Sequence, residues 1–122
     1  MSDQPLISVV DDDPSLCAAV AGLLRTLGYQ SRSFLSAEAF LAWEGARGCA
    51  CVITDIHMPG LSGIDLKQLL VARNNAVPVI MITARSDEGL EERALSSGAI
   101  CLLKKPFAAD VLIDCLNKAL HS

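Results

Sequence analysis

Three consecutive aspartates, Asp11, Asp12 and Asp13, directly follow the apolar run Leu6–Val10, and they carry the clearest potential for chemistry. Two carboxylates in contact repel by ~4 kcal/mol at an effective dielectric near 20. Such a cluster at the end of a buried strand either raises the pKa of one acid, which then keeps its proton, or holds a cation. Carboxylate oxygens with room for water suit Mg²⁺ better than a softer metal. The sequence therefore predicts a magnesium site behind the first apolar run.

Polar groups also follow the later apolar runs: Asp55 after Cys51–Thr54, Thr83 at the end of Val77–Thr83, and Lys105 after Ala99–Leu103. Taken singly, each of these groups has a plain alternative as a surface carboxylate, a buried hydroxyl or a solvated ammonium. The carboxyl ends of parallel strands, however, share one edge of a sheet, where ligands bind. We therefore expect the aspartates, the hydroxyl and the ammonium to meet at one rim.

Asp13 has a structural role available that its neighbours lack. It precedes Pro14, which suits the first helical position, and Gly28 follows as a stop signal. This pattern predicts a helix that begins with Asp13 as its N-cap. Asp11 and Asp12 remain as the functional pair.

The apolar runs are continuous rather than alternating, which is typical of strands covered on both faces of a parallel sheet. A weaker run, Gln30–Phe34, fits an edge strand. Helical patterns lie between the runs, and we expect them at residues 14–27, at Ala37–Ala42 after Ser36, after Gly63, from Ser86-Asp87-Glu88 to Gly98, and from about Ala108 to Leu120. Five βα units with right-handed crossovers predict a doubly wound α/β fold with five parallel strands and five helices. We expect residues 1–122 to form one domain.

Composition narrows the class of protein. The 122 residues are 52% apolar with a net charge of −4, which disfavours direct nucleic-acid binding. No signal peptide is expected at the N-terminus, and no apolar run approaches the ~20 residues of a membrane-spanning helix. The five cysteines lack a CxxC pair and are expected to be buried hydrophobes in a reducing cytoplasm: Cys17, Cys49, Cys51, Cys101 and Cys115.

Four segments together resemble a known family: Val9–Asp12, Asp55–Gly60, Ile82–Ala84 and Lys105–Phe107. Over nearly its whole length the chain resembles the receiver domain of bacterial response regulators, the CheY-like family. The resemblance implies the strand order 2-1-3-4-5 and a phospho-acceptor switch of a two-component system. Receivers signal rather than act as enzymes on other substrates, so we expect no enzyme activity beyond the chain's own phosphorylation and dephosphorylation.

The resemblance also implies a metal site. Asp12 and Asp55 would bind Mg²⁺ directly, and Asp11 would bind it mainly through water. The backbone carbonyl of His57 would complete the protein ligands. The His57 side chain is a poor candidate, because one imidazole beside hard oxygen ligands does not make a zinc site.

The same resemblance assigns the phosphoryl chemistry. Asp55 would accept the phosphoryl group from a sensor histidine kinase, Thr83 would hydrogen-bond that group, and Lys105 would pair with it. The chemical types of these residues suit the roles, because phosphoryl transfer requires positioning and charge neutralisation more than covalent help from the protein. Ala84 is small enough to leave the acceptor open. The family pattern further implies a cis peptide bond before Pro106.

Two segments, Ser36–Leu41 and Met58–Gly63, are similar to FixJ-type transcription regulators. Gly60 and Gly63 are interpreted as turn residues that lead into a helix, not as a phosphate-binding loop. The FixJ likeness implies control of transcription through the surface formed by the fourth helix, the fifth strand and the fifth helix. That surface would change partner binding or support a homodimer.

Leu102 departs from the family pattern, which often has an aromatic residue at this position of the fifth strand. Leucine has no polar tip, and its burial gains roughly 1.5–3 kcal/mol over full exposure. We therefore expect Leu102 to be largely buried, and we expect the loop after Thr83 and the fourth helix to carry most of the switch.

Three alternatives stay open. A phosphohydrolase with an aspartyl-phosphate intermediate usually has a second acid two residues after the nucleophile, where this chain has His57. A pseudo-receiver binds partners without phosphorylation but usually lacks part of the acid, threonine and lysine set. A flavin-binding domain of the same fold would need a hydroxyl-rich phosphate loop after the first strand.

Overall fold

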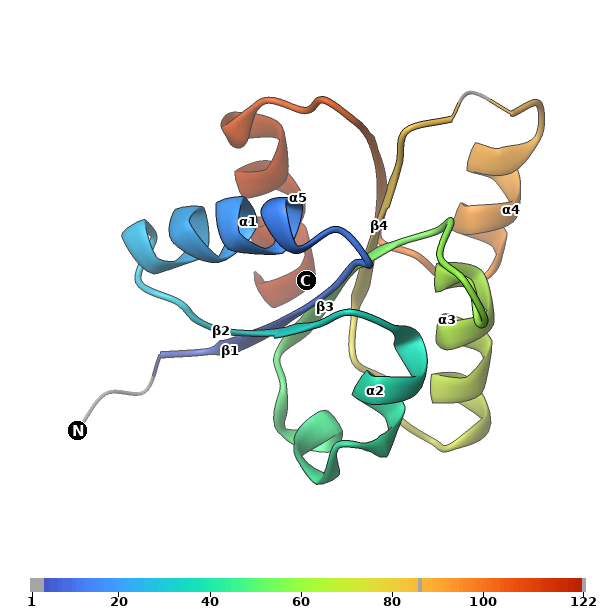
Figure 1. Ribbon diagram of the computed structural model, residues 1–122, viewed down its shortest axis with the longest axis horizontal. Coiled ribbons are helices and arrows are strands. Elements are labelled where there is room, and N and C mark those ends of the chain that lie inside the picture. Colours follow the sequence, from blue (N-terminus) through green and yellow to red (C-terminus); the bar gives the residue numbers. More distant parts are fainter. Residues whose placement is uncertain (1–3, 86, 122) are drawn as a thin grey trace.

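The computed structural model describes residues 4–85 and 87–121. A single parallel sheet has the order β2-β1-β3-β4-β5 (Figure 1). Its strands are β1 (Leu6–Val10), β2 (Gln30–Phe34), β3 (Cys51–Asp55), β4 (Val79–Thr83) and β5 (Cys101–Lys104). The predicted fold class and strand order are confirmed.

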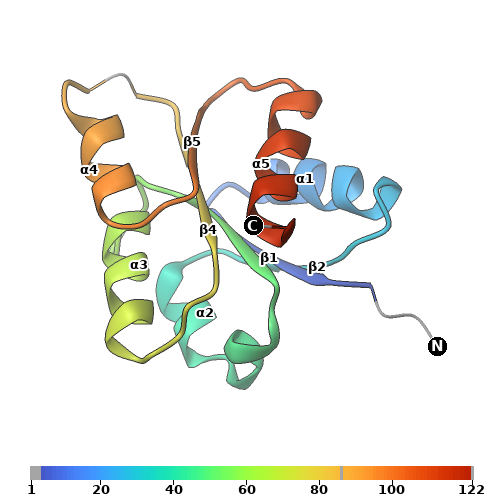
Figure 2. The same ribbon diagram turned by 180° about the vertical axis from the view of Figure 1, so that it is seen from behind.

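Helices cover both faces of this sheet, as Figures 1 and 2 show. Their bounds are α1 (Pro14–Thr26), α2 (Ala37–Ala42), α3 (Gly63–Ala72), α4 (Leu90–Ser96) and α5 (Ala109–His121). A short 3₁₀ helix, η1 (Glu44–Gly48), which the sequence patterns did not predict, leads into β3. Helices α1 and α5 lie on one face, and α2, α3 and α4 lie on the other. In the part of the chain that the structure describes, no helix has both the length and the hydrophobicity to cross a membrane.

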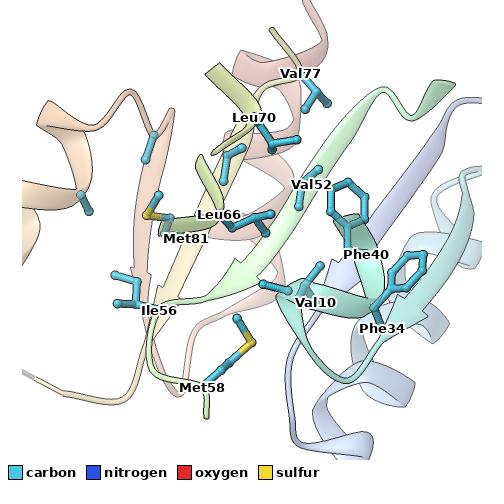
Figure 3. Packing of buried hydrophobic residues seen from close by; sticks show 14 of the residues in the cluster. Val10, Phe34, Phe40, Val52, Ile56, Met58, Leu66, Leu70, Val77 and Met81 are labelled. Atoms are coloured by element: carbon cyan, nitrogen blue, oxygen red, sulfur yellow. The ribbon is translucent and has the colours of Figure 1, made fainter. Parts of the chain in front are cut away.

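Strand side chains alternate between two hydrophobic clusters, one on each face. Ile7 and Val9 pack with α1 and α5, whereas Val10 packs with α2, α3 and α4. Figure 3 shows the second cluster, in which Phe34 meets Phe40 edge to face with ring centroids 5.4 Å apart. Burial on both faces explains why the strands are continuously apolar.

Helix α1 begins as predicted. The Asp13 side chain accepts a hydrogen bond from the Ser15 N–H at 2.9 Å, and Pro14 is the first helical residue. Gly28, after the C-cap, has φ +89°, a conformation that glycine adopts without steric cost. These local signals fix the helix that follows the aspartates.

Helix α4 begins later than predicted. Asp87 and Glu88 precede it, and its N-cap is Gly89 with φ +77°. Ser86, the first residue of the predicted start, lies outside the described residues, but Asp87 and Glu88 of that start are not helical. β4 also starts later, at Val79, because Pro78 before it has no N–H to donate to a strand partner.

Candidate functional site

The predicted site residues are positioned by the carboxyl ends of four parallel strands. Asp55 and Thr83 are the last residues of β3 and β4, while Asp11 and Lys105 directly follow β1 and β5. Backbone bonds continue the sheet past the strand ends, from Asp11 N–H to Phe34 O at 3.0 Å and from Lys105 N–H to Thr83 O at 2.7 Å. The side chains of these residues therefore project from a rigid edge. Figure 2 shows the loops after β4 and β5 leaving the same end of the sheet.

Three of the predicted metal ligands lie together. Carboxylate oxygens of Asp11, Asp12 and Asp55 all fall within 4.8 Å of one another. Asp11 and Asp55 are only 1% and 6% exposed, whereas Asp12 is exposed. A set of hard oxygen donors with one side open to water fits Mg²⁺, which keeps several of its waters when bound.

The loop after Asp55 folds back onto the acceptor. The His57 N–H donates to Asp55 Oδ1 at 3.2 Å, which places residue 57 beside the cluster. The His57 Nε2 atom is buried and has no hydrogen-bond partner among the described residues. The imidazole does not belong to the cluster of potential ligand atoms found in the described chain, in keeping with a backbone role for this residue.

Lys105 joins the two buried acids. Its Nζ lies 3.1 Å from Asp11 Oδ2 and 3.2 Å from Asp55 Oδ2. The other Asp11 oxygen, Oδ1, accepts the Asp13 N–H at 2.9 Å. One ammonium thus offsets part of the repulsion between two carboxylates that burial has removed from water. The peptide bond from Lys105 to Pro106 is cis, as predicted.

Burial and charge shift the pKa values of this pair. Burial raises the pKa of Asp11 above its ordinary value of 3.8, and the bonds from Asp13 and Lys105 only partly oppose the rise. Burial disfavours the charged form of Lys105, but the bond to Asp11 and the charge of Asp55 outweigh it and raise the lysine's pKa. Lys105 therefore stays protonated, as a counter-ion to an anionic group must.

Thr83 is buried at the rim, and its hydroxyl is engaged locally. Its Oγ1 accepts the Arg85 N–H at 3.0 Å. The Arg85 side chain turns to Asp87, at 3.3 Å, in an exposed ion pair. Leu102 is partly buried: it packs against the cluster that contains Val10 and Met81, and with Thr83 and Leu90 it lines an open hollow of about 220 Å³. The expectation for Leu102 holds only in part.

The five cysteines are free and buried, as predicted. Burial raises the pKa of the Cys51 thiol to about 12, so this thiol is inert at neutral pH. None of them belongs to a metal-ligand cluster within the described chain.

Two further residues were missed by the sequence patterns. Lys67 is only 8% exposed, and it follows the spacing i, i+3, i+4, i+7 shared by the buried α3 residues Gly63, Leu66, Lys67 and Leu70. That spacing could have identified it as a buried lysine. Glu38 reaches from α2 to the loop after β3, a contact that no sequence pattern predicts.

The doubly wound parallel sheet, with three aspartates, a hydroxyl and a lysine at its carboxyl edge, makes the chain an α/β domain with an acidic site at the ends of its strands. The chain belongs to the response regulator receiver domain family, whose model matches residues 7–117.

Known relatives agree with this assignment. The chain is 36% identical over 121 residues to the response regulator protein TmoT of Ectopseudomonas mendocina, covering 98% of this chain and 55% of that protein. It is 32% identical over 121 residues to the transcriptional regulatory protein FixJ of Bradyrhizobium diazoefficiens, covering 99% and 59%. The crystal structure of FixJ-N superposes with a TM-score of 0.88 at 31% identity, covering 100% of this chain and 98% of that one. The chain spans about half the length of these curated relatives, and its likeness to FixJ-type regulators is confirmed.

Proposed function

We propose that this receiver is a phospho-acceptor switch in which Asp55 takes a phosphoryl group from a sensor histidine kinase. One observation carries the proposal: Asp55 lies at the end of β3, with Asp11 and Asp12 oxygens within 4.8 Å and the Lys105 ammonium 3.2 Å away. A carboxylate acceptor in this setting can gain further negative charge, because the Lys105 ammonium lies beside it and the aspartates can hold a cation that offsets the rest.

The metal in this proposal is Mg²⁺. Asp12 and Asp55 hold it directly, Asp11 holds it through water, and the His57 carbonyl supplies the remaining protein oxygen. When bound, the ion neutralises charge on the transferring phosphoryl oxygens. Within the protein, Asp11 and Asp12 fix the position of the cation against the acceptor.

Lys105 and Thr83 bind the phosphoryl group in this proposal. The Lys105 ammonium is a compact charge already within 3.2 Å of the acceptor oxygen. The Thr83 hydroxyl, which now donates to the Arg85 carbonyl at 3.4 Å, donates instead to a phosphoryl oxygen, which pulls the loop after β4 toward the site. Ala84, exposed at the rim, leaves the approach open.

Two surfaces near the site are assigned to binding partners in this proposal. An open apolar hollow of about 530 Å³ lies against Lys105, between α1 and the loop after β5. We assign this surface to the kinase, because it is apolar and open and is lined by Lys105, which lies 3.2 Å from Asp55. The surface of α4, β5 and α5 carries the output, namely partner binding or a homodimer, and in the whole protein the control of transcription. In this proposal residues 1–122 form one receiver unit that works in the cytoplasm.

The test is mass spectrometry after incubation with a small phosphodonor and Mg²⁺. Wild-type protein should gain one labile phosphoryl group on Asp55, and Asp55→Asn should gain none while keeping the fold. Asp114→Asn, an exposed acid of α5, is the matched control and should label fully. Equal labelling of Asp55→Asn and wild type would end the assignment. Absence of labelling in wild type would favour a pseudo-receiver, and rapid hydrolysis of phosphomonoesters other than the phosphodonor would favour a phosphohydrolase.

A further inference from the structure

Glu38 of α2 contacts the loop that leaves the site. The Leu61 N–H donates a hydrogen bond to Glu38 Oε2 at 3.2 Å. The two residues belong to different βα units and to the two segments, Ser36–Leu41 and Met58–Gly63, that resemble FixJ-type regulators. The structure therefore joins these segments physically.

Gly60 makes this contact possible. Its φ is +79°, and a Cβ at this position would collide with Glu38 Oε2. A side chain here would be strained and would also displace the carboxylate from Leu61. The glycine thus has two roles, the turn itself and the close approach of Glu38.

The ends of the loop are anchored by other contacts. Near its start, Met58 is buried in the cluster that Figure 3 shows, which also contains Val10, and Gly63 N–H bonds to Ile56 O at 3.0 Å. At its end, Ser62 and Asp65 form a capping box that starts α3. Between these anchors, the Glu38 bond ties the loop to α2.

We propose that Glu38 is a positioning residue for the metal site. By holding Leu61, four positions after His57, it fixes the path of the loop and the direction of the His57 carbonyl. The inference rests on the proposed function, in which that carbonyl is a Mg²⁺ ligand. Groups that orient metal ligands contribute to metal affinity without touching the ion.

The experiment compares Glu38→Ala, Glu38→Gln and Glu38→Asp in the unphosphorylated protein. Glutamine keeps an acceptor oxygen without the charge, whereas aspartate keeps the charge without the reach. Glu92→Ala is the matched control, because Glu92 is an exposed acid in the first turn of α4 as Glu38 is in that of α2. The measurements are amide hydrogen exchange at Leu61, Mg²⁺ affinity by calorimetry, and urea unfolding without Mg²⁺.

In Glu38→Ala and Glu38→Asp, the amide hydrogen of Leu61 should exchange faster than in wild type. Both variants should bind Mg²⁺ about twofold to tenfold more weakly, a change that corresponds to the net free energy of one hydrogen bond. Glu38→Gln should stay close to wild type, and Glu92→Ala should not differ from it. Faster exchange at Leu61 with unchanged Mg²⁺ affinity would overturn the positioning role while leaving the proposed function intact. Failure of the wild type itself to bind Mg²⁺ would instead overturn both.

Discussion

At the scale of single residues, Asp11, Asp55 and Lys105 form a charge cluster that is poised for a further cation. The lysine lies 3.1 Å and 3.2 Å from the two acids, and its single charge leaves one carboxylate charge uncompensated. The unfavourable energy of this uncompensated charge falls mainly on Asp11, because it is the most deeply buried of the three aspartates. A bound divalent cation removes this cost, which couples metal binding to stability.

The substitution Asp11→Asn tests whether the buried charge of Asp11 lowers the free energy of unfolding. Because burial raises the pKa of Asp11, the native state binds a proton more readily than the unfolded chain does. The resulting stability is fully present below the ordinary pKa of 3.8 and is lost as pH rises through the folded-state pKa. Asp11→Asn should therefore be more stable than wild type at neutral pH without Mg²⁺, and the difference should disappear in acid.

Urea unfolding across pH in a chelator measures this effect, with the exposed Asp110→Asn as control. Addition of Mg²⁺ should stabilise wild type more than Asp11→Asn. An Asp11→Asn protein that is no more stable than wild type at neutral pH contradicts the assignment.

Substitutions at Thr83 and Leu102 distinguish which of the two residues transmits the switch. Thr83→Ala should be phosphorylated but should lose phosphorylation-dependent dimerisation, because no hydroxyl remains to pull the loop after β4. Leu102→Ala should keep that coupling, and it should cost less than the 2–5 kcal/mol typical of a fully buried leucine, because Leu102 is only half-buried. Light scattering with and without phosphodonor, and urea unfolding, measure both. The reverse result, with Leu102→Ala uncoupled and Thr83→Ala coupled, would assign the switch to β5.

At the scale of elements, α3 carries a buried lysine on its core-facing side. Lys67 Nζ donates to Val77 O at 3.5 Å, and a Cβ at Gly98 would lie 2.9 Å from Lys67 Cε. The lysine stem thus fills space between α3 and the turns before β4 and β5. One long hydrogen bond compensates poorly for burial of an ammonium group.

Lys67→Met should stabilise the protein at neutral pH. Burial lowers the pKa of Lys67 below 10.5, so the native state binds a proton less readily than the unfolded chain. Stability of the wild type therefore rises as pH goes from the folded-state pKa toward 10.5, and the advantage of methionine should shrink over that window. Thermal melts from neutral to alkaline pH measure this, with exposed Lys118→Met as control. A pH-independent difference would mean that packing alone accounts for the effect.

At the scale of the whole molecule, the sheet ends at the edge strand β5, which α4 flanks on one face and α5 on the other. The α4, β5 and α5 surface exposes apolar side chains, with Leu95 45% and Val111 43% exposed. The hollow lined by Thr83 and Leu102 lies at the edge of that surface, next to the first turn of α4. In the proposed function, a change at Thr83 would therefore have a short path to a partner on that surface.

Leu95→Asp should weaken the proposed phosphorylation-dependent homodimer by about tenfold or more, because an unpaired carboxylate at an apolar interface costs more than the ~1.4 kcal/mol of one decade. Its labelling at Asp55 should match that of wild type. Val71→Asp is the matched control, because Val71 is 57% exposed on α3, away from the proposed interface. Sedimentation of phosphorylated protein gives the result. Equal weakening by both substitutions would place the interface elsewhere.

The sequence by itself determined the strands, the class of fold and the candidate site. Continuous apolar runs such as Leu6–Val10 can be buried only in a sheet covered on both faces, and parallel strands bring their last residues to one edge. Local signals were equally sufficient for α1, because Asp13, Pro14 and Gly28 act within one turn of the helix ends. They were not sufficient for α4, where Gly89 rather than the preceding acids begins the helix.

Only the tertiary structure decided which groups touch. Lys105 pairs with Asp11 and Asp55 although these residues lie far apart in the chain. The same is true of the hydrogen bond from Leu61 to Glu38. The half-burial of Leu102 likewise depends on tertiary packing. The strand pattern predicted that Lys105, Asp11 and Asp55 lie at one rim, but it did not predict which of them are in contact. Such contacts depend on side-chain direction and on the path of loops, which no periodicity encodes. The sequence therefore placed the chemistry at one edge of the sheet, and the packing of the loops determined how its charges are paired and held.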